Sequence, residues 1–500
     1  MPEENNKHQM ALWRMQHRDI TEKKEKLNPN DLAEYIIYYP GRKIITFQDT
    51  DEILRYDEKN QTGVYKPAQT EIEYELQELA ESGCSKHLVE ETLAAIRRQT
   101  RVSREIISSN PYLIPLQNCI YDAKTQTTMP YSKEHVFLHK HPIKYNPNAT
   151  CPKIEKFLSE VIGKEKDIAL IKEMVGYCFI RHYHFENIFL LVGEGANGKS
   201  TFINILSEML GEESVTHKSF QILTNYLFGV NALFGKNANL FADLPQKAFT
   251  DTGMLKALSG TDKIETEIKF KGSISFRNYA KLIGSCNEAP ESPDDSDAFY
   301  RRWIIIPFPN KFEGKNEVKG LYEQLTTPEE LSGFFNESIK AFLEAEERKE
   351  FSYTATTQEK KKQYLGYSNN VKAFCEERLE QDDNAEIPKS ELYAEYKAFC
   401  QKQRLKEKSL VWFYRALYKT FGGAVRQSRK EKVFVVTGIA FKEEEQETVV
   451  KLVLVPAPAT SSAWLGRCRA CNDIKKIEYI DEKDCRKGYC GGCAEKIKAG

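Results

Sequence analysis

A nine-residue loop between an apolar run and an amphipathic segment constrains this chain most. The loop reads Gly193-Glu194-Gly195-Ala196-Asn197-Gly198-Lys199-Ser200-Thr201 and follows the apolar residues 188–192. This spacing fits the Walker A pattern, in which backbone N–H groups surround a triphosphate at the positive end of a helix. Lys199 is then expected to neutralise the β- and γ-phosphates, and Ser200 to bind Mg²⁺. The sequence therefore predicts an α/β core that binds a nucleoside triphosphate.

The length and charge of the chain limit the rest of the architecture. Because 500 residues exceed what one core usually organises, we expect three or four units. No apolar run is long enough to cross a bilayer and no signal-peptide core begins the chain, which predicts a cytoplasmic protein without membrane contact. With 72 basic and 73 acidic residues the net charge is −1, so any contact with nucleic acid must come from local clusters.

Two further apolar runs end in polar side chains that suit a nucleotide site. Residues 238–242 lead to Asp243, and residues 280–286 lead to Asn287. In an open α/β sheet such residues lie beside the phosphate loop, where Asp243 is predicted to bind the Mg²⁺ shell. The Asn287 amide is predicted to sense the γ-phosphate or to orient water.

Arg301 and Arg302 precede a fourth apolar run, residues 303–308, and follow an acidic loop. Two adjacent arginines are compatible with a surface pair. Their place at a strand edge favours a finger that completes the site of a neighbouring subunit.

The region before the motor has weaker signals. Residues 1–30 are polar and predict a mobile arm, residues 32–39, 44–47 and 53–56 predict a small β element, and residues 71–108 predict two helices. Asp49 and Asp51 are either metal ligands, as in primases, or part of a solvated turn, which we favour. His135, His139 and His141 lack a fourth ligand nearby, so structural or surface roles are favoured.

Four motifs in fixed order resemble superfamily 3 helicases. The resemblance is to the primase-helicase type of phages, plasmids and archaeal viruses, related to the poxvirus primase-helicase. The motifs are GEGANGKST, NLFADLP with DTGMLKALSGTDKIETEIKFKG, YAKLIGSCNEAP, and DDSDAFYRRWIIIPFPNKF, and the similarity extends over residues 100–350. It implies an AAA+ P-loop ATPase that assembles as a ring, usually a hexamer, and translocates 3′ to 5′ along single-stranded DNA at a fork.

The resemblance also assigns roles to individual residues. Lys269 and Lys271 flank Phe270 on a turn, which gives two cations and an aromatic ring that could contact DNA in a central pore; the alternative is an ordinary basic turn. Lys256 is a weaker candidate for the same contact. One departure concerns Asp243, which has no acidic neighbour in sequence. The general base is therefore left open between Asp243 itself, Glu265 and Glu267.

The C-terminal third predicts two further modules. Helical patterns beginning at Ser390 and Ser409, a basic turn and the apolar run 433–436 favour a winged-helix-like domain over residues 368–445, with Arg415 and Lys419 as phosphate contacts; a protein-docking module is the alternative. Residues 464–500 contain Cys468, Cys471, Cys490 and Cys493 as two Cys-x-x-Cys pairs, a spacing typical of tetrahedral Zn²⁺. Cys485 is a spare or alternate ligand.

These inferences combine into one model of the chain. It comprises an arm (1–30), a β element and helical module (31–185), a helicase motor (186–350), the winged-helix-like domain and the zinc tail. We expect an ATP-driven replicative DNA helicase of a mobile genetic element, with ATP, Mg²⁺ and Zn²⁺ as cofactors and single-stranded and forked DNA as partners. A separate primase or polymerase is expected, because little chain precedes the motor. An initiator or loader that does not unwind DNA, and a primase-helicase, are the alternatives.

Overall fold

The computed structural model describes residues 9, 12, 27–57, 63–80, 83–268, 272–312, 320–403, 405–430 and 433–442, and five short strands after residue 453. Two compact units are present: residues 1–375 with 390–422, and residues 376–389 with 423–500. None of the described helices is long and apolar enough to cross a membrane.

The first part of unit 1 is a small four-stranded sheet with three helices. Its strands β1 (Arg42–Phe47), β2 (Ile53–Asp57), β3 (Lys66–Pro67) and β4 (Arg101–Val102) are ordered β3-β2-β1-β4. The helices are α2 (Pro29–Ile37), α3 (Gln69–Ala80) and α4 (Lys86–Gln99). The two predicted helices of residues 71–108 and two of the predicted strands are thus confirmed.

Residues 32–39, which we expected to extend the β element, instead form most of α2. The Asn28 side chain accepts a hydrogen bond from the Asn30 amide, and Pro29 occupies the first turn. Leu32, Ala33 and Ile36 are buried on one face at helical spacing. The cap and this spacing outweigh the strand preference of the aromatic and β-branched side chains.

Short antiparallel strands and two helices connect this part to the central sheet. The strands are β5 (Leu113–Pro115), β6 (Ile120–Asp122) and β7 (Thr127–Met129), and the helices are α5 (Pro152–Val161) and α6 (Glu165–Phe179).

The central sheet of unit 1 is parallel and has the order β14-β8-β13-β10-β9. Its strands are β8 (Ile188–Val192), β9 (Val215–Thr216), β10 (Ala238–Phe241), β13 (Lys281–Cys286) and β14 (Trp303–Pro307). The helices between them are α7 (Lys199–Leu210), α8 (Phe220–Asn225), α9 (Leu227–Val230), α10 (Gly253–Leu258) and α11 (Asp297–Tyr300). A separate hairpin pairs β11 (Lys263–Ile268) with β12 (Gly272–Arg277).

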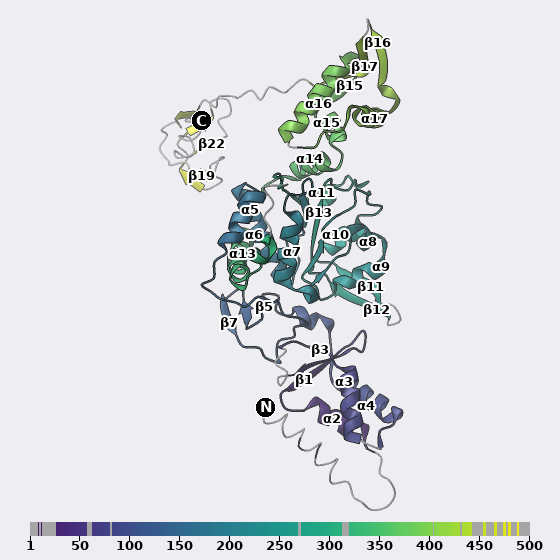
Figure 1. Ribbon diagram of the computed structural model, residues 1–500, viewed down its shortest axis with the longest axis vertical. Helices are drawn as coiled ribbons and strands as arrows, with labels where there is room; N and C mark the ends of the chain where they lie inside the picture. Colours follow the sequence, from purple (N-terminus) through teal and green to yellow (C-terminus); the bar gives the residue numbers. More distant parts are fainter. Residues whose placement is uncertain are drawn as a thin grey trace, which may run out of the picture. The chain divides into compact units, whose positions relative to one another are not determined.

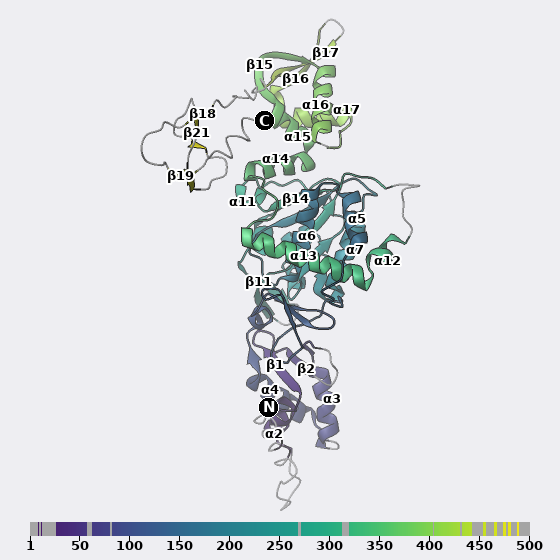
Figure 2. The ribbon, with the colours of Figure 1, turned by 90° about the vertical axis from the view of Figure 1, so that its left-hand side faces the viewer.

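Successive side chains of β8 and β14 enter two different cores. Phe189 and Leu191 pack with α5, α6, α7 and the long α13 (Pro328–Arg348). Ile188, Leu190 and Val192 pack with α8 and α10 on the other face. Figure 1 shows these two helical layers on either side of the sheet, and Figure 2 shows α13 beside α6. A strand buried on both faces explains why β8 is a continuous apolar run.

A helix lies between the predicted helicase segment, which ends at residue 350, and the predicted winged-helix-like domain, which begins at residue 368. After the short α12 (Leu321–Leu325) and α13, the chain forms α14 (Thr357–Ser368) and α15 (Asn370–Arg378). Thr356 and Glu359 form a capping box for α14. Tyr364 is buried in the core against Phe299 and Trp303, so α14 packs with the core of the central sheet. Because α14 contains a run of charged residues, its sequence shows no apolar pattern that would predict this packing.

The remaining helices of unit 1 are α16 (Lys389–Gln403) and α17 (Leu410–Phe421), which begin close to the predicted Ser390 and Ser409. In unit 2, β15 (Leu379–Pro388), β16 (Arg426–Lys430) and β17 (Val433–Phe441) form an antiparallel sheet with β17 in the centre. The predicted basic turn therefore lies mostly in β16. β18 (Leu454–Pro456), β19 (Leu465–Arg467), β20 (Ile474–Lys476), β21 (Tyr479–Asp481) and β22 (Gly488–Tyr489) follow.

Candidate nucleotide site

The phosphate loop connects β8 to α7 with little room for side chains. A Cβ atom on Gly193 would lie 2.1 Å from Asn197 Nδ2 and 2.4 Å from the Phe308 carbonyl oxygen. Gly198 has φ +86°, and its Cβ would lie 2.7 Å from a Val161 methyl group. Both positions therefore require glycine. By contrast, none of the described residues lies within 4 Å of a Cβ built on Gly195, which leaves this side of the loop open among them.

Lys199 begins α7 and is buried within the loop. Its Nζ atom donates to the carbonyl oxygens of Gly193 at 2.5 Å and Glu194 at 3.0 Å, and to Asn197 Oδ1 at 2.8 Å. Burial lowers the pKa of Lys199, and nearby Cys286 and Asp243 act in the opposite direction. Ser200 and Thr201 follow on the first turn of α7. These residues fit a Mg-triphosphate, because N–H donors, a cation and a hydroxyl group gather at a helix N-terminus.

The ends of three parallel strands bring the other predicted residues to this loop. β13 lies between β8 and β10, so the residues that follow them reach one edge of the sheet. A pocket of about 480 Å³ is lined there by Glu194 and Gly195 of the loop, by residues 243–246, and by Asn287 and Glu288. The structure thus brings Asp243 and Asn287 together with the loop, as the sequence predicted.

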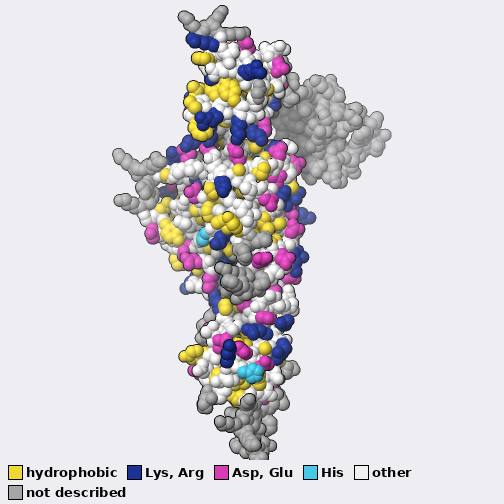
Figure 3. Space-filling model, turned by 90° about the vertical axis from the view of Figure 1, so that its right-hand side faces the viewer, with side chains coloured by type: hydrophobic (Ala, Val, Ile, Leu, Met, Phe, Trp, Pro, Cys, Tyr) yellow, Lys and Arg dark blue, Asp and Glu magenta, His cyan; other side chains and the backbone are white. Residues whose placement is uncertain are grey.

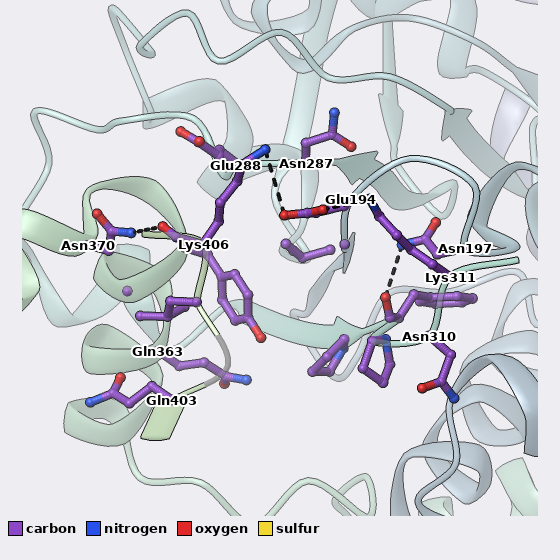
Figure 4. Close-up of a pocket in the computed structure, with 18 of the residues that line it drawn as sticks. Glu194, Asn197, Asn287, Glu288, Asn310, Lys311, Gln363, Asn370, Gln403 and Lys406 are labelled. Carbon is purple, nitrogen blue, oxygen red and sulfur yellow. Dashed lines mark hydrogen bonds and ion pairs between the residues drawn. The ribbon is translucent and has the colours of Figure 1, made fainter. Parts of the chain in front are cut away.

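A larger pocket of about 690 Å³ adjoins the same loop (Figure 4). Besides the phosphate loop and the pair Asn287 and Glu288, four further parts of the described chain line it: residues 162–167, residues 307–311, α14 with Asn370, and residues 403–408. Its size and mixed lining suit the base and ribose of a nucleotide.

Three lysines and a glutamate at these pockets were missed by sequence reasoning. Lys311 Nζ lies 3.0 Å from one Glu194 carboxylate oxygen and Lys406 Nζ lies 3.7 Å from the other. Lys408 Nζ lies 2.6 Å from Glu288. Chiefly because of Lys311, the pKa of Glu194 is lowered. Lys311 and Glu288 lie inside two of the quoted motifs, which offered a signal for both. No motif marks Lys406 and Lys408, because they come from a segment distant in sequence.

Arg301 and Arg302 lie at the end of the parallel strands that is opposite to the phosphate loop. Trp303 pairs with Ile188 at the start of the parallel strands, whereas the phosphate loop follows their far ends. Arg302 is buried and donates to Ser259 Oγ at 3.1 Å and to the Ala298 carbonyl at 2.6 Å. Arg301 is about half exposed and pairs with Glu186 at 2.9 Å. Neither arginine therefore reaches the phosphate loop of its own chain, and Arg301 is the more accessible of the two.

Several predicted contacts are outside the residues that the structure describes. Lys269, Phe270 and Lys271 are among them, although β11 and β12 pair up to Ile268 and Gly272 on either side. The zinc-ligand prediction, with Cys468, Cys471, Cys490, Cys493 and the spare Cys485, and most of the arm of residues 1–30, also lie outside. Lys256 pairs with Asp294 at 2.9 Å.

The remaining polar candidates have local partners. Asp49 forms a double hydrogen bond with Arg104 at 2.7 and 2.8 Å, and Asp51 pairs with Arg101 at 3.0 Å. His139 and His141 are buried and hydrogen-bonded to Asn237 and to the Leu210 carbonyl, respectively. These contacts give each of the four residues a structural role.

Three family models match the chain in order. Residues 33–163 match a "D5 N terminal like" family, residues 191–302 a family of unknown function, and residues 366–446 a "Poxvirus D5 protein-like" family. The second match contains the phosphate loop, Asp243, Asn287 and both arginines.

Curated relatives are viral. A putative helicase of Invertebrate iridescent virus 3 is 25% identical over 59% of this chain and 35% of the relative. A putative helicase of Acanthamoeba polyphaga mimivirus is 25% identical over 42% and 23%, and a putative primase of African swine fever virus is 20% identical over 74% and 42%. The chain therefore spans less than half the length of these relatives.

Among solved structures, the apo C-terminal region of NrS-1 aligns with 84% of this chain and 100% of that chain, at 12% identity and a TM-score of 0.44. The family resemblance comes from the sequence matches. Because D5-like models match both sides of the phosphate-loop region and the viral relatives are named as helicases and a primase, the chain fits a primase-helicase type.

Proposed function

We propose that this chain is an ATP-driven DNA helicase motor in the replication of a mobile genetic element. The observation that carries the proposal is the convergence of the phosphate loop, Asp243 and Asn287 on one pocket. In this proposal Lys199 contacts the β- and γ-phosphates, Ser200 and Asp243 hold Mg²⁺, and Asn287 contacts the γ-phosphate or the attacking water.

The proposed motor assembles as an AAA+ ring, and six is the expected number of subunits. Support comes from Arg301, which lies at the sheet edge away from its own loop and is accessible to a neighbouring subunit. An arginine supplied in trans stabilises the charge that develops during phosphoryl transfer. Each ATP site in this proposal therefore consists of the loop of one subunit and Arg301 of the next.

Local surfaces provide the proposed DNA contacts. On the face in Figure 3, basic and acidic side chains are interspersed, in keeping with the net charge of −1. The β11–β12 hairpin would present Lys269, Phe270 and Lys271 to one DNA strand. On α17, Trp412 is 60% exposed and the Arg415 guanidinium lies 4.9 Å from its ring. An exposed aromatic with a cation suits stacking on a base or contact with a phosphate.

Two modules extend the proposal to the C-terminal region. Residues 368–445 are proposed to bind DNA as a winged-helix-like domain; their helices α16 and α17 belong to unit 1, and their strands β16 and β17 belong to unit 2. Cys468, Cys471, Cys490 and Cys493 are proposed to bind one Zn²⁺. Metal analysis of the purified chain should find one zinc per chain, and Cys468→Ser with Cys471→Ser should remove it.

Strand displacement on a forked duplex tests the proposed function. The wild-type chain should separate the strands with ATP, and Lys199→Ala should abolish both ATP hydrolysis and displacement. ATP hydrolysis without displacement would favour an initiator or loader instead. Primer synthesis that survives Lys199→Ala but is lost in Asp49→Ala would favour a primase-helicase; the Arg104 partner of Asp49 argues against that role.

A further inference from the structure

An acidic residue outside the predicted set lies at the end of β13. Glu288 directly follows Asn287 and lines both pockets at the phosphate loop. Because β13 lies between β8 and β10, its C-terminal end is placed between the loop and Asp243. Glu288 therefore supplies, at the end of the neighbouring strand, the second carboxylate that is missing from the residues adjacent to Asp243 in sequence.

The other acidic residues near the site are less suited to activate water. Among the described residues, three carboxylates line the smaller pocket: Glu194, Asp243 and Glu288. Glu194 belongs to the phosphate loop itself rather than to the end of a neighbouring strand. Glu265 and Glu267 lie on exposed positions of β11 and line neither pocket. With Asp243 assigned to Mg²⁺, Glu288 is the carboxylate that remains.

The charges of Glu288 and Asp243 both affect the pKa of one buried thiol, that of Cys286. Burial raises the pKa of the Cys286 thiol to about 12, and the charges of Asp243 and Glu288 act in the same direction. Lys199 acts on this thiol in the opposite direction. The charges of the loop lysine and of the two carboxylates thus all act on the thiol at the end of β13.

Lys408 holds the Glu288 carboxylate from the segment between α16 and α17. Its Nζ atom lies 2.6 and 2.7 Å from the two carboxylate oxygens, and the Gln246 side chain donates to one of them. The backbone of Lys408 is fixed in turn: its N–H donates to Tyr396 Oη at 2.9 Å, and Tyr393 Oη donates to its carbonyl at 3.0 Å. Glu288 is therefore oriented by a residue more than one hundred positions away in sequence.

We propose that Glu288 is the catalytic carboxylate that activates water for ATP hydrolysis, and that Lys408 is its positioning residue. This inference rests on the proposed ATPase function. The water oxygen forms a bond to the γ-phosphorus while the bond from this phosphorus to the β,γ-bridging oxygen breaks. One water proton passes to a Glu288 oxygen, the bridging electron pair leaves with ADP, and Glu288 later releases its proton to solvent.

Steady-state hydrolysis and nucleotide binding by Glu288→Gln test the role of Glu288. Glutamine keeps the side-chain size and can still accept a hydrogen bond from Lys408, so the fold should persist. We expect kcat to fall by at least about 100-fold. The dissociation constant for a fluorescent ATP analogue should stay within about threefold, because Glu288 acts on water rather than on ATP binding. Glu291→Gln is the matched control, because Glu291 is exposed on the same segment and lines neither pocket.

A double-mutant cycle tests Lys408. Lys408→Gln should lower kcat less than Glu288→Gln does, and the double variant should be no slower than Glu288→Gln alone, because Lys408 acts through Glu288. Fully additive losses would overturn the positioning role. A kcat within threefold of wild type in Glu288→Gln would overturn the catalytic role. A wild-type chain no faster than Lys199→Ala would instead overturn the proposed function, and this inference with it.

Discussion

At the residue scale, the phosphate loop depends on backbone conformation as much as on charge. Gly198 combines φ +86° with a Cβ position 2.7 Å from Val161, so Gly198→Ala is expected to lower the free energy of unfolding by about 1–3 kcal/mol. Gly195→Ala is the matched control, because a Cβ at Gly195 meets nothing within 4 Å. Urea unfolding of both variants measures the difference, and equal losses would contradict the assigned role of Gly198.

Two buried histidines make stability depend on pH. Burial lowers the pKa of His139 to about 4 and that of His141 to about 3. Both values lie below that of an unfolded histidine, so between about pH 6.5 and 4 the unfolded chain binds more protons and stability decreases as pH falls. We expect a loss of about 1 kcal/mol per histidine at pH 5.5 relative to pH 7.5.

Urea unfolding of unit 1 against pH measures this loss. His139→Gln should reduce the loss between pH 7.5 and pH 5.5 by about 1 kcal/mol, because one histidine with a lowered pKa is removed, whereas His141, His182 and His184 remain. His87, which is exposed on α4, provides the control His87→Gln. An equal effect of both substitutions would contradict the assignment.

At the element scale, patterns local in sequence predicted the central parallel α/β core well. The apolar run of β8, the glycines of the loop and the amphipathic α7 each carry their own signal, and Asp243 and Asn287 were found because they end apolar strands. Predictions differed from the structure where a helix cap, or a contact between residues distant in sequence, determines which element forms. Asn28 and Pro29 begin α2 within a strand-like composition, and Tyr364 anchors α14 within a charged one.

The positions of Glu288 and Lys408 show a second limit. Lys408 reaches the site only because α14, α15 and α16 return the chain to the end of β13, and the two tyrosines of α16 then fix its backbone. A single sequence encodes this contact through many packing interactions and no motif. The ring, the zinc and the DNA contacts remain predictions for a different reason. Each of them depends on a partner: another subunit, a metal ion or DNA.

The β11–β12 hairpin leads to a prediction about coupling between ATP hydrolysis and DNA. Lys269→Ala with Lys271→Ala should lower strand displacement at least about tenfold, because two phosphate contacts are lost. ATP hydrolysis without DNA should stay within about threefold, since the described residues of the hairpin line neither pocket. Lys263→Ala, at the base of the same hairpin, is the control and should leave displacement unchanged. Equal loss in both would show that only the hairpin fold matters.

At the scale of the whole molecule, the separation of Arg301 from the phosphate loop makes a prediction about assembly. If each site combines the loop of one subunit with Arg301 of the next, Arg301→Ala and Lys199→Ala should each hydrolyse ATP poorly. Mixing the two should restore activity, because a loop from the arginine variant can meet Arg301 of the lysine variant. Random assortment of equal amounts would rebuild about a quarter of the sites. Hydrolysis by the mixture is compared with each variant alone at the same total concentration. No restoration, with both variants folded and assembled, would show that Arg301 does not act between subunits and that its Glu186 pair is its main role.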